Sequence, residues 1–279
     1  MATKTNAAAP AKKSSGFKGV KNAIWILVIC CVAAYAFYFQ VLGAPDNFAG
    51  GDPTGHPVNL MGTVYKGGFV VGLILTLLLS VICLGVERFF ALKSAFGTMS
   101  LGKFTKQVKE LIKAGKFDEA IALCNKMKGS VANVVLASLR AYKDMESGAN
   151  VSLKKSQKVA KIQQAHEEAT QLEMPTLQMN LPIIATIVTL GTLTGLLGTV
   201  TGMIRSFQAL AAGGGGDSLA LSTGISEALI NTAFGIATSW CAVIAYNFFT
   251  NKIDKLTYAL DEVGYSIAQT YEASHADEA

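Results

Sequence analysis

The fold is decided by residues Leu219–Thr250, which read LALSTGISEALINTAFGIATSWCAVIAYNFFT. The stretch is apolar and carries a single charged residue, Glu227. Glu227 lies eight residues into the stretch, which is about 12 Å of helix and leads towards the middle of a hydrocarbon layer about 30 Å thick. A charged group at that depth costs at least about 2.5 kcal/mol, so such residues usually move ions or bind a partner.

Further polar residues share the face of the helix that carries Glu227. Thr223, Glu227, Asn231 and Thr238 follow one another at spacings of 4, 4 and 7, which places them on one stripe. This stripe predicts a proton-handling surface with Thr223, Asn231 and Thr238 as possible pore-facing residues. In the competing interpretation, Glu227 is protonated and only joins neighbouring helices through hydrogen bonds.

The composition is that of a membrane protein with a sizeable polar portion. The chain has 279 residues, of which 51% are hydrophobic and 15% charged, and its mean hydropathy is +0.39. The fold class expected is all-α, an integral membrane helical protein. Its five cysteines form no CxxC pair or Cys/His cluster, so we expect no metal site, disulfide framework or cofactor. The sequence carries no GxSG-type, HExxH or paired intramembrane Asp pattern, which argues against an enzyme.

Hydropathy divides the chain into nine segments. We expect a disordered basic N-terminus (1–23), transmembrane helices at 24–42, 64–86, 181–207 and 221–249, loops at 43–63 and 208–220, a helical domain at 87–180, and a C-terminal helix and tail at 250–279. A signal peptide is the alternative for 24–42. The run is longer than a usual signal core and no small-residue cleavage site follows, because Leu42 would occupy position −3, so we expect it to be retained.

Lysines and arginines predict the orientation. From the N-terminus, the five segments outside the membrane carry 5, 0, 15, 0 and 2 of them, which places both termini and the helical domain in the cytoplasm and both loops outside. The lysines at 103, 106, 109, 113 and 116 lack any nucleic-acid motif, so we expect them to face anionic membrane lipids and not nucleic acid. His166 lies in a polar helical patch, and we expect it at the surface.

The third membrane helix carries a row of small residues. Gly191, Gly195, Gly198 and Gly202 recur at spacings of 4, 3 and 4, which predicts close packing against another helix. Thr189, Thr192 and Thr199 follow the adjoining face. Threonines in membrane helices often bond only their own helix carbonyls, but a threonine row beside a glycine row suggests a hydrated surface facing the same bundle as Glu227.

Two motifs resemble the ExbB/TolQ/MotA family of bacterial inner-membrane proton-channel subunits, and the ExbB branch most closely. Residues 196–207, LLGTVTGMIRSF, resemble GLxGTVxGxxxSF, and residues 225–235, ISEALINTAFG, resemble IxEALxxTAxG. The resemblance is strong over 181–249 and looser at residues 115–125, GKFDEAIALCN.

The resemblance implies that Thr199, Glu227 and Thr232 line a proton channel. It also implies a homo-oligomeric ring, typically a pentamer, around a dimer of an ExbD-like single-span protein that carries a functional aspartate. Such an assembly uses the proton motive force to drive a TonB-like transducer. Thr232 lies five residues from Glu227, about 140° around the helix, so it cannot share the stripe that carries Glu227.

The number of spans departs from the family's usual ExbB form. That form has three spans, whereas 24–42 adds a fourth, as in MotA. The sequence therefore leaves open a TolQ-like or MotA-like subunit, and also a non-conducting scaffold.

Overall fold

The structure is a computed structural model that describes residues 19–20, 22–53, 55–147, 153–212 and 218–275. It divides into two units, which we describe separately. Residues 20–88 and 180–250 form the membrane unit, and residues 89–179 and 251–279 belong to the polar unit. The N-terminal segment expected to be disordered lies almost wholly outside the described residues, as do residues 213–217 of the loop predicted at 208–220.

Among the described residues, four helices are long and apolar enough to cross a membrane. They are α1 (Ala23–Phe37), extended by the π-helical turn η1 (Tyr38–Leu42), then α3 (Phe69–Phe96), α8 (Leu181–Ala212) and α9 (Ser218–Ser274). Over the described residues there is no β-strand, only an isolated bridge between Phe48 and Pro57. The predicted all-α fold with four membrane helices is confirmed.

The second membrane helix begins later than the sequence predicts. Residues 60–66 form a separate short helix, α2 (Leu60–Lys66), whose first turn is capped by the Asn59 side chain. Gly67 and Gly68 follow, and Gly68 has a φ of +77°, a conformation that side chains disfavour and that ends the helix. The break leaves Lys66 at the end of α2, outside the membrane-spanning α3.

Aromatic packing holds α2 in place. The Tyr65 ring stacks on Tyr38 of η1 at a centroid distance of 4.6 Å and meets Phe48 edge-on at 5.5 Å. The Tyr38 hydroxyl also donates to the Tyr65 carbonyl at 2.8 Å. These contacts fix the backbone immediately before Lys66 and Gly67.

Helix α3 continues past residue 86, the predicted end of the second membrane helix. The charged residues that follow, Glu87 and Arg88, are paired with each other inside the membrane unit. Arg88 is fully buried and its Nε donates to Glu87 Oε2 at 2.6 Å. Glu87 also accepts from the Val20 backbone at 2.8 Å and from Asn180 Nδ2 at 3.3 Å. With its charges satisfied, the helix continues to Phe96.

The last two membrane helices are also longer than predicted. α8 continues through Gln208–Ala212, where four of the five residues are Ala or Leu, the strongest helix formers. α9 is one helix of 57 residues, so the C-terminal helix predicted as separate is its continuation. Residues 250–255 contain no Gly or Pro to interrupt it.

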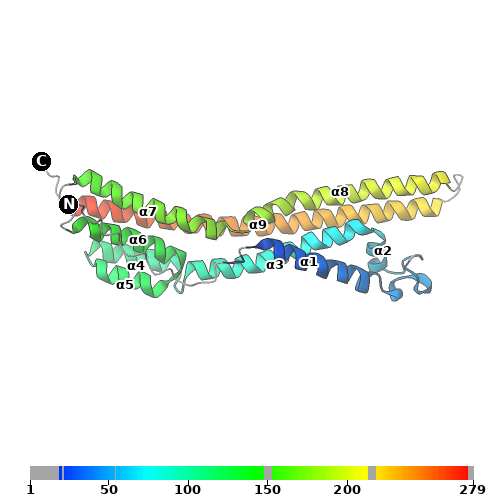
Figure 1. The fold of residues 1–279 in the computed structure, drawn as a ribbon, viewed down its shortest axis with the longest axis horizontal. Helices are drawn as coiled ribbons and strands as arrows, with labels where there is room; N and C mark the ends of the chain where they lie inside the picture. The colour runs from blue at the N-terminus through cyan, green and yellow to red at the C-terminus, as the bar shows by residue number, and fades with distance from the viewer. Residues whose placement is uncertain (1–18, 21, 54, 148–152, 213–217, 276–279) are drawn as a thin grey trace, which may run out of the picture. The chain divides into compact units, whose positions relative to one another are not determined.

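Helices α8 and α9 run side by side (Figure 1). The four glycines of α8 lie against α9 so closely that a Cβ at Gly195 would be 2.9 Å from the Asn231 carbonyl oxygen. At Gly191 the nearest atom would be the Ser239 hydroxyl, and at Gly202 the Ala228 Cβ. At Gly195 the two backbones therefore meet directly, whereas at Gly191, Gly198 and Gly202 the nearest atom belongs to a side chain of α9.

The polar unit is built from helices. These are α4 (Leu101–Lys113), α5 (Phe117–Met127), α6 (Gly129–Glu146), α7 (Lys155–Gln178) and the C-terminal part of α9. Tyr142 of α6 stacks on Phe117 at 4.2 Å and meets Tyr271 of α9 edge-on at 4.9 Å. Aromatic packing therefore joins α5, α6 and α9.

The expectation that His166 lies at the surface is wrong. The residue is 7% exposed, and its Nδ1 lies 2.9 Å from the hydroxyl of Ser138 on α6. It follows the buried Ile162 by one helical turn, so it belongs to the inner face of α7 while the polar patch around it covers the outer face. Gly264 of α9 makes room for the ring, because a Cβ there would be 2.5 Å from Nε2.

Candidate functional site

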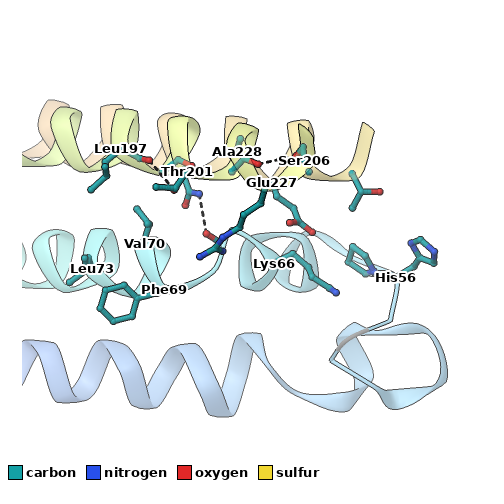
Figure 2. Close-up of a pocket in the computed structure, with 18 of the residues that line it drawn as sticks. His56, Lys66, Phe69, Val70, Leu73, Leu197, Thr201, Ser206, Glu227 and Ala228 are labelled. Atoms are coloured by element: carbon teal, nitrogen blue, oxygen red, sulfur yellow. Dashed lines mark hydrogen bonds between the residues drawn. The ribbon is translucent and has the colours of Figure 1, made fainter. Parts of the chain in front are cut away.

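The main candidate site is a cavity of about 590 Å³ inside the membrane unit, which we call the Glu227 cavity. Its walls come from α2, the start of α3, the second half of α8 and the start of α9. Figure 2 shows the Glu227 side chain extending from α9 towards α2, where Lys66 lies. The other lining residues include apolar side chains, Val70, Leu73 and Leu197 among them, and His56 from the loop before α2.

Three of the four stripe residues predicted on α9 line this cavity. Thr223, Glu227 and Asn231 succeed one another at intervals of four residues and all contribute to the wall. Thr238 does not. It is fully buried, and its hydroxyl donates to the Phe234 carbonyl of its own helix at 2.9 Å. The cavity therefore occupies only the first part of the predicted stripe.

Two basic residues that were not predicted for the site from the sequence face Glu227. Lys66 comes from the end of α2 and Arg205 from α8, and both line the cavity and act electrostatically on the Glu227 carboxyl. Their positive charges attract the ionised carboxylate. The glycine pair at 67–68 was the available signal, because it separates Lys66 from the apolar helix that follows.

Thr199 and Thr232 meet each other and do not line the Glu227 cavity. Their hydroxyls are hydrogen-bonded across the interface of α8 and α9. Thr199 Oγ1 also lies 3.3 Å from the Ala228 carbonyl, and Thr232 Oγ1 lies 3.4 Å from the Gly195 carbonyl. Within one chain, the three residues implied to line the channel thus fall into two groups.

Thr192 belongs to the same helix interface. Its hydroxyl is 2.8 Å from that of Ser239 on α9. The glycine row lies beside these contacts, with Gly198 against the Asn231 side chain. Of the predicted threonine row, Thr192 and Thr199 therefore contact α9, whereas Thr189 is exposed.

Asn231 connects the cavity wall to the break between α2 and α3. Its Nδ2 donates to the Gly67 carbonyl at 3.0 Å. The residue is 2% exposed. One side chain therefore joins α9 to the backbone that follows Lys66.

These features define a class of protein, a multi-pass helical membrane protein in which a carboxyl group faces a partly polar cavity between its helices. A family model described as the MotA/TolQ/ExbB proton channel family matches residues 129–262, which include both motifs and the Glu227 stripe. Over these residues the chain is similar to this family.

Three curated relatives show the extent of the similarity. The ExbB-like 3 biopolymer transport protein of Synechocystis sp. is 32% identical over 87 residues, 30% of this chain and 41% of its own. The Tol-Pal system protein TolQ of Pseudomonas aeruginosa is 37% identical over 95 residues, 34% of this chain and 41% of its own. TolQ of Haemophilus influenzae is 33% identical over 88 residues, 32% of this chain and 39% of its own. The chain thus spans about two fifths of the length of these relatives.

Proposed function

We propose that the chain is a proton-channel subunit of an inner-membrane motor, in which Glu227 takes up and releases the transferred proton. The observation that supports this most directly is the position of Glu227 in the wall of a cavity of about 590 Å³, beside Lys66 and Arg205. A carboxyl group between a cavity and two cations can exist in both protonation states. Similarity to a proton-channel family over residues 129–262 agrees with this role.

The transferred ion is H⁺ in this proposal. Na⁺ requires several oxygen ligands, and Glu227 is the one carboxylate among the described residues that line the cavity, which also include Lys66 and Arg205. A site with this balance of charge repels a bound metal cation. A proton is transferred between groups and needs no such shell of ligands.

The complete machine is assigned by family analogy. We propose a ring, typically a pentamer, around an ExbD-like single-span dimer whose aspartate exchanges the proton with Glu227 or with water held near Thr199 and Thr232. In the first form the motor energises a TonB-like transducer for outer-membrane transport. The TolQ relatives from two bacteria favour a Tol-Pal-type machine as the second form, and the four spans retain a MotA-like motor as the third. We place both termini and residues 87–180 in the cytoplasm, on the charge pattern of the chain.

Replacement of the carboxyl tests the function. Glu227→Gln keeps the shape and hydrogen-bonding capacity of the side chain but removes the titratable proton. We expect the variant to assemble with its single-span partner, as measured by native mass, and to lose proton flux into vesicles that contain a pH-sensitive dye. Glu168→Gln is the matched control, because Glu168 is exposed on α7. Undiminished flux in Glu227→Gln would contradict the role assigned to Glu227, and absence of flux with the natural sequence would leave only the scaffold interpretation.

The choice between machines needs a measurement in cells. Loss of the gene should abolish uptake through TonB-dependent receptors if the first form is correct, weaken the outer envelope if the TolQ-like form is correct, or stop motility if the MotA-like form is correct. Glu227→Gln should reproduce the same defect. If a gene that encodes Glu227→Gln fully restores the function lost with the natural gene, a proton-driven machine of any of these kinds is contradicted.

A further inference from the structure

The Asn231 side chain contains a buried hydrogen-bond acceptor that the protein leaves unsatisfied. The residue is 2% exposed, and its Oδ1 has no hydrogen-bond partner in the described residues. Its other amide atom is satisfied, because Nδ2 donates to the Gly67 carbonyl. Buried polar atoms nearly always have a partner, so the open acceptor points to a donor that arrives in another state of the site.

The orientation of this amide is determined by its surroundings. A flip of the side chain would turn Oδ1 towards the Gly67 carbonyl and bring two acceptors together. Gly198 of α8 also confines the side chain, because a Cβ at Gly198 would lie 2.5 Å from Asn231 Cβ and 2.7 Å from its Cγ. The amide therefore cannot turn away to find another donor.

Glu227 is the group within reach that gains a donor when its protonation state changes. It precedes Asn231 by one helical turn, the spacing at which side chains on a helix meet, and both residues line the same cavity. An ionised carboxylate only accepts hydrogen bonds, whereas a protonated carboxyl group donates one. Lys66, Arg205 and His56 also line the cavity, but in this structure none of them donates to Oδ1.

We propose that Asn231 is a positioning residue for the protonated form of Glu227, whose carboxyl O–H donates to Asn231 Oδ1. The inference rests on the proposed function, in which Glu227 alternates between protonation states. Protonation would then complete a chain from the Glu227 carboxyl through the Asn231 amide to the Gly67 carbonyl. It would tie the proton site on α9 to the break between α2 and α3.

Infrared spectroscopy of the full chain with its single-span partner in lipid vesicles tests the proposal. The C=O stretch of protonated Glu227 is the band that appears on acidification and is absent in Glu227→Gln. In Asn231→Leu, which is nearly the same size, we expect this band at a higher wavenumber, because the carboxyl group has lost a hydrogen bond. Thr238→Val is the control on the same stripe and should leave the band in place, since Thr238 does not line the cavity.

A second measurement avoids any change to Asn231. With ¹³C-labelled asparagine amides, the protein with its natural sequence should show an amide C=O change that accompanies the Glu227 band, and Glu227→Gln should lack it. An unmoved Glu227 band in Asn231→Leu, or no coupled amide change, overturns the role of Asn231 while the proposed function stands. If no protonated Glu227 band appears at any pH, the proposed function itself fails.

Discussion

Thr199 and Thr232 are hydrogen-bonded to each other across the interface of α8 and α9, whereas Glu227, five residues before Thr232, faces a cavity on another side of α9. The separation follows from helix geometry, because five residues correspond to a rotation of about 140°. In one chain, the threonine hydroxyls therefore join two helices while the carboxyl group meets the cations. The two groups of residues should respond differently to substitution.

The threonine pair should contribute measurably to the stability of the membrane unit. In a double-mutant cycle of Thr199→Val and Thr232→Val, we expect a coupling free energy of about 0.6 kcal/mol, and at most about 1.7 kcal/mol, the range found for hydrogen bonds between membrane helices. The measurement is reversible unfolding in detergent micelles. Thr201→Val combined with Thr232→Val is the control and should be additive, because Thr201 bonds only carbonyls of its own helix. Zero coupling between Thr199 and Thr232 would contradict the contact.

The glycine row should tolerate no added methyl group at its centre. Gly195→Ala would place a Cβ 2.9 Å from the Asn231 carbonyl oxygen and 3.1 Å from the Gly235 Cα, and neither backbone atom can move aside. We expect a loss of about 1–3 kcal/mol in the free energy of unfolding, as for other overpacked interiors. Gly102→Ala on α4 meets no atom within 4 Å and should cost nothing or gain up to about 1 kcal/mol. Equal effects at both positions would argue against close packing of α8 and α9.

The buried pair of Glu87 and Arg88 should be sensitive to loss of one charge. Glu87→Gln removes the negative charge beside a fully buried guanidinium. Breaking such pairs typically destabilises a protein by about 3–5 kcal/mol, and we expect a corresponding fall in the unfolding free energy. Glu110→Gln, at an exposed position on α4, should change it by less than about 0.5 kcal/mol. If the two variants unfold alike, the pair does not stabilise the chain.

His166 should make the polar unit less stable in acid. Burial lowers the pKa of the ring below its ordinary value of 6.5, even though Asp261 and Glu167 act in the opposite direction. The unfolded chain then binds the proton more readily, so the stability is fully present above pH 6.5 and declines as the pH falls below it. Hydrogen–deuterium exchange in α6 and α7 should therefore accelerate on acidification.

The matched variant for this prediction is His166→Asn. Asparagine keeps an acceptor or donor for the Ser138 hydroxyl but removes the titratable ring. Its exchange rates, corrected for the intrinsic effect of pH, should depend less on pH than those of the natural sequence. Equal pH dependence in the two proteins would assign the effect to other groups.

Periodicity in the sequence was sufficient for the features that arise within one helix. The apolar runs predicted four membrane helices, and the spacing of Thr223, Glu227 and Asn231 placed these residues on one face. The family resemblance was visible in two motifs, and the family match agrees with it.

Features that depend on contacts between helices were not predictable in the same way. The convergence of Lys66 and Arg205 on Glu227 requires the break at Gly67–Gly68. Hydropathy does not register this break, because apart from Lys66 the residues on both sides of it are mostly apolar. His166 was placed at the surface by its polar neighbours in sequence, although its ring contacts residues of α6 and α9. Thr238 keeps the period of the stripe but lies beyond the end of the cavity.

The contact of α8 with α9 has a mechanical consequence. Side chains between two helices normally allow small sliding motions, because they can change rotamer as the helices shift. At Gly195 and Gly235 backbone lies directly on backbone, so a displacement of one helix along the other meets fixed atoms there. The pair is therefore built to move as a single body, and the motions of a working cycle must occur where this body adjoins other surfaces.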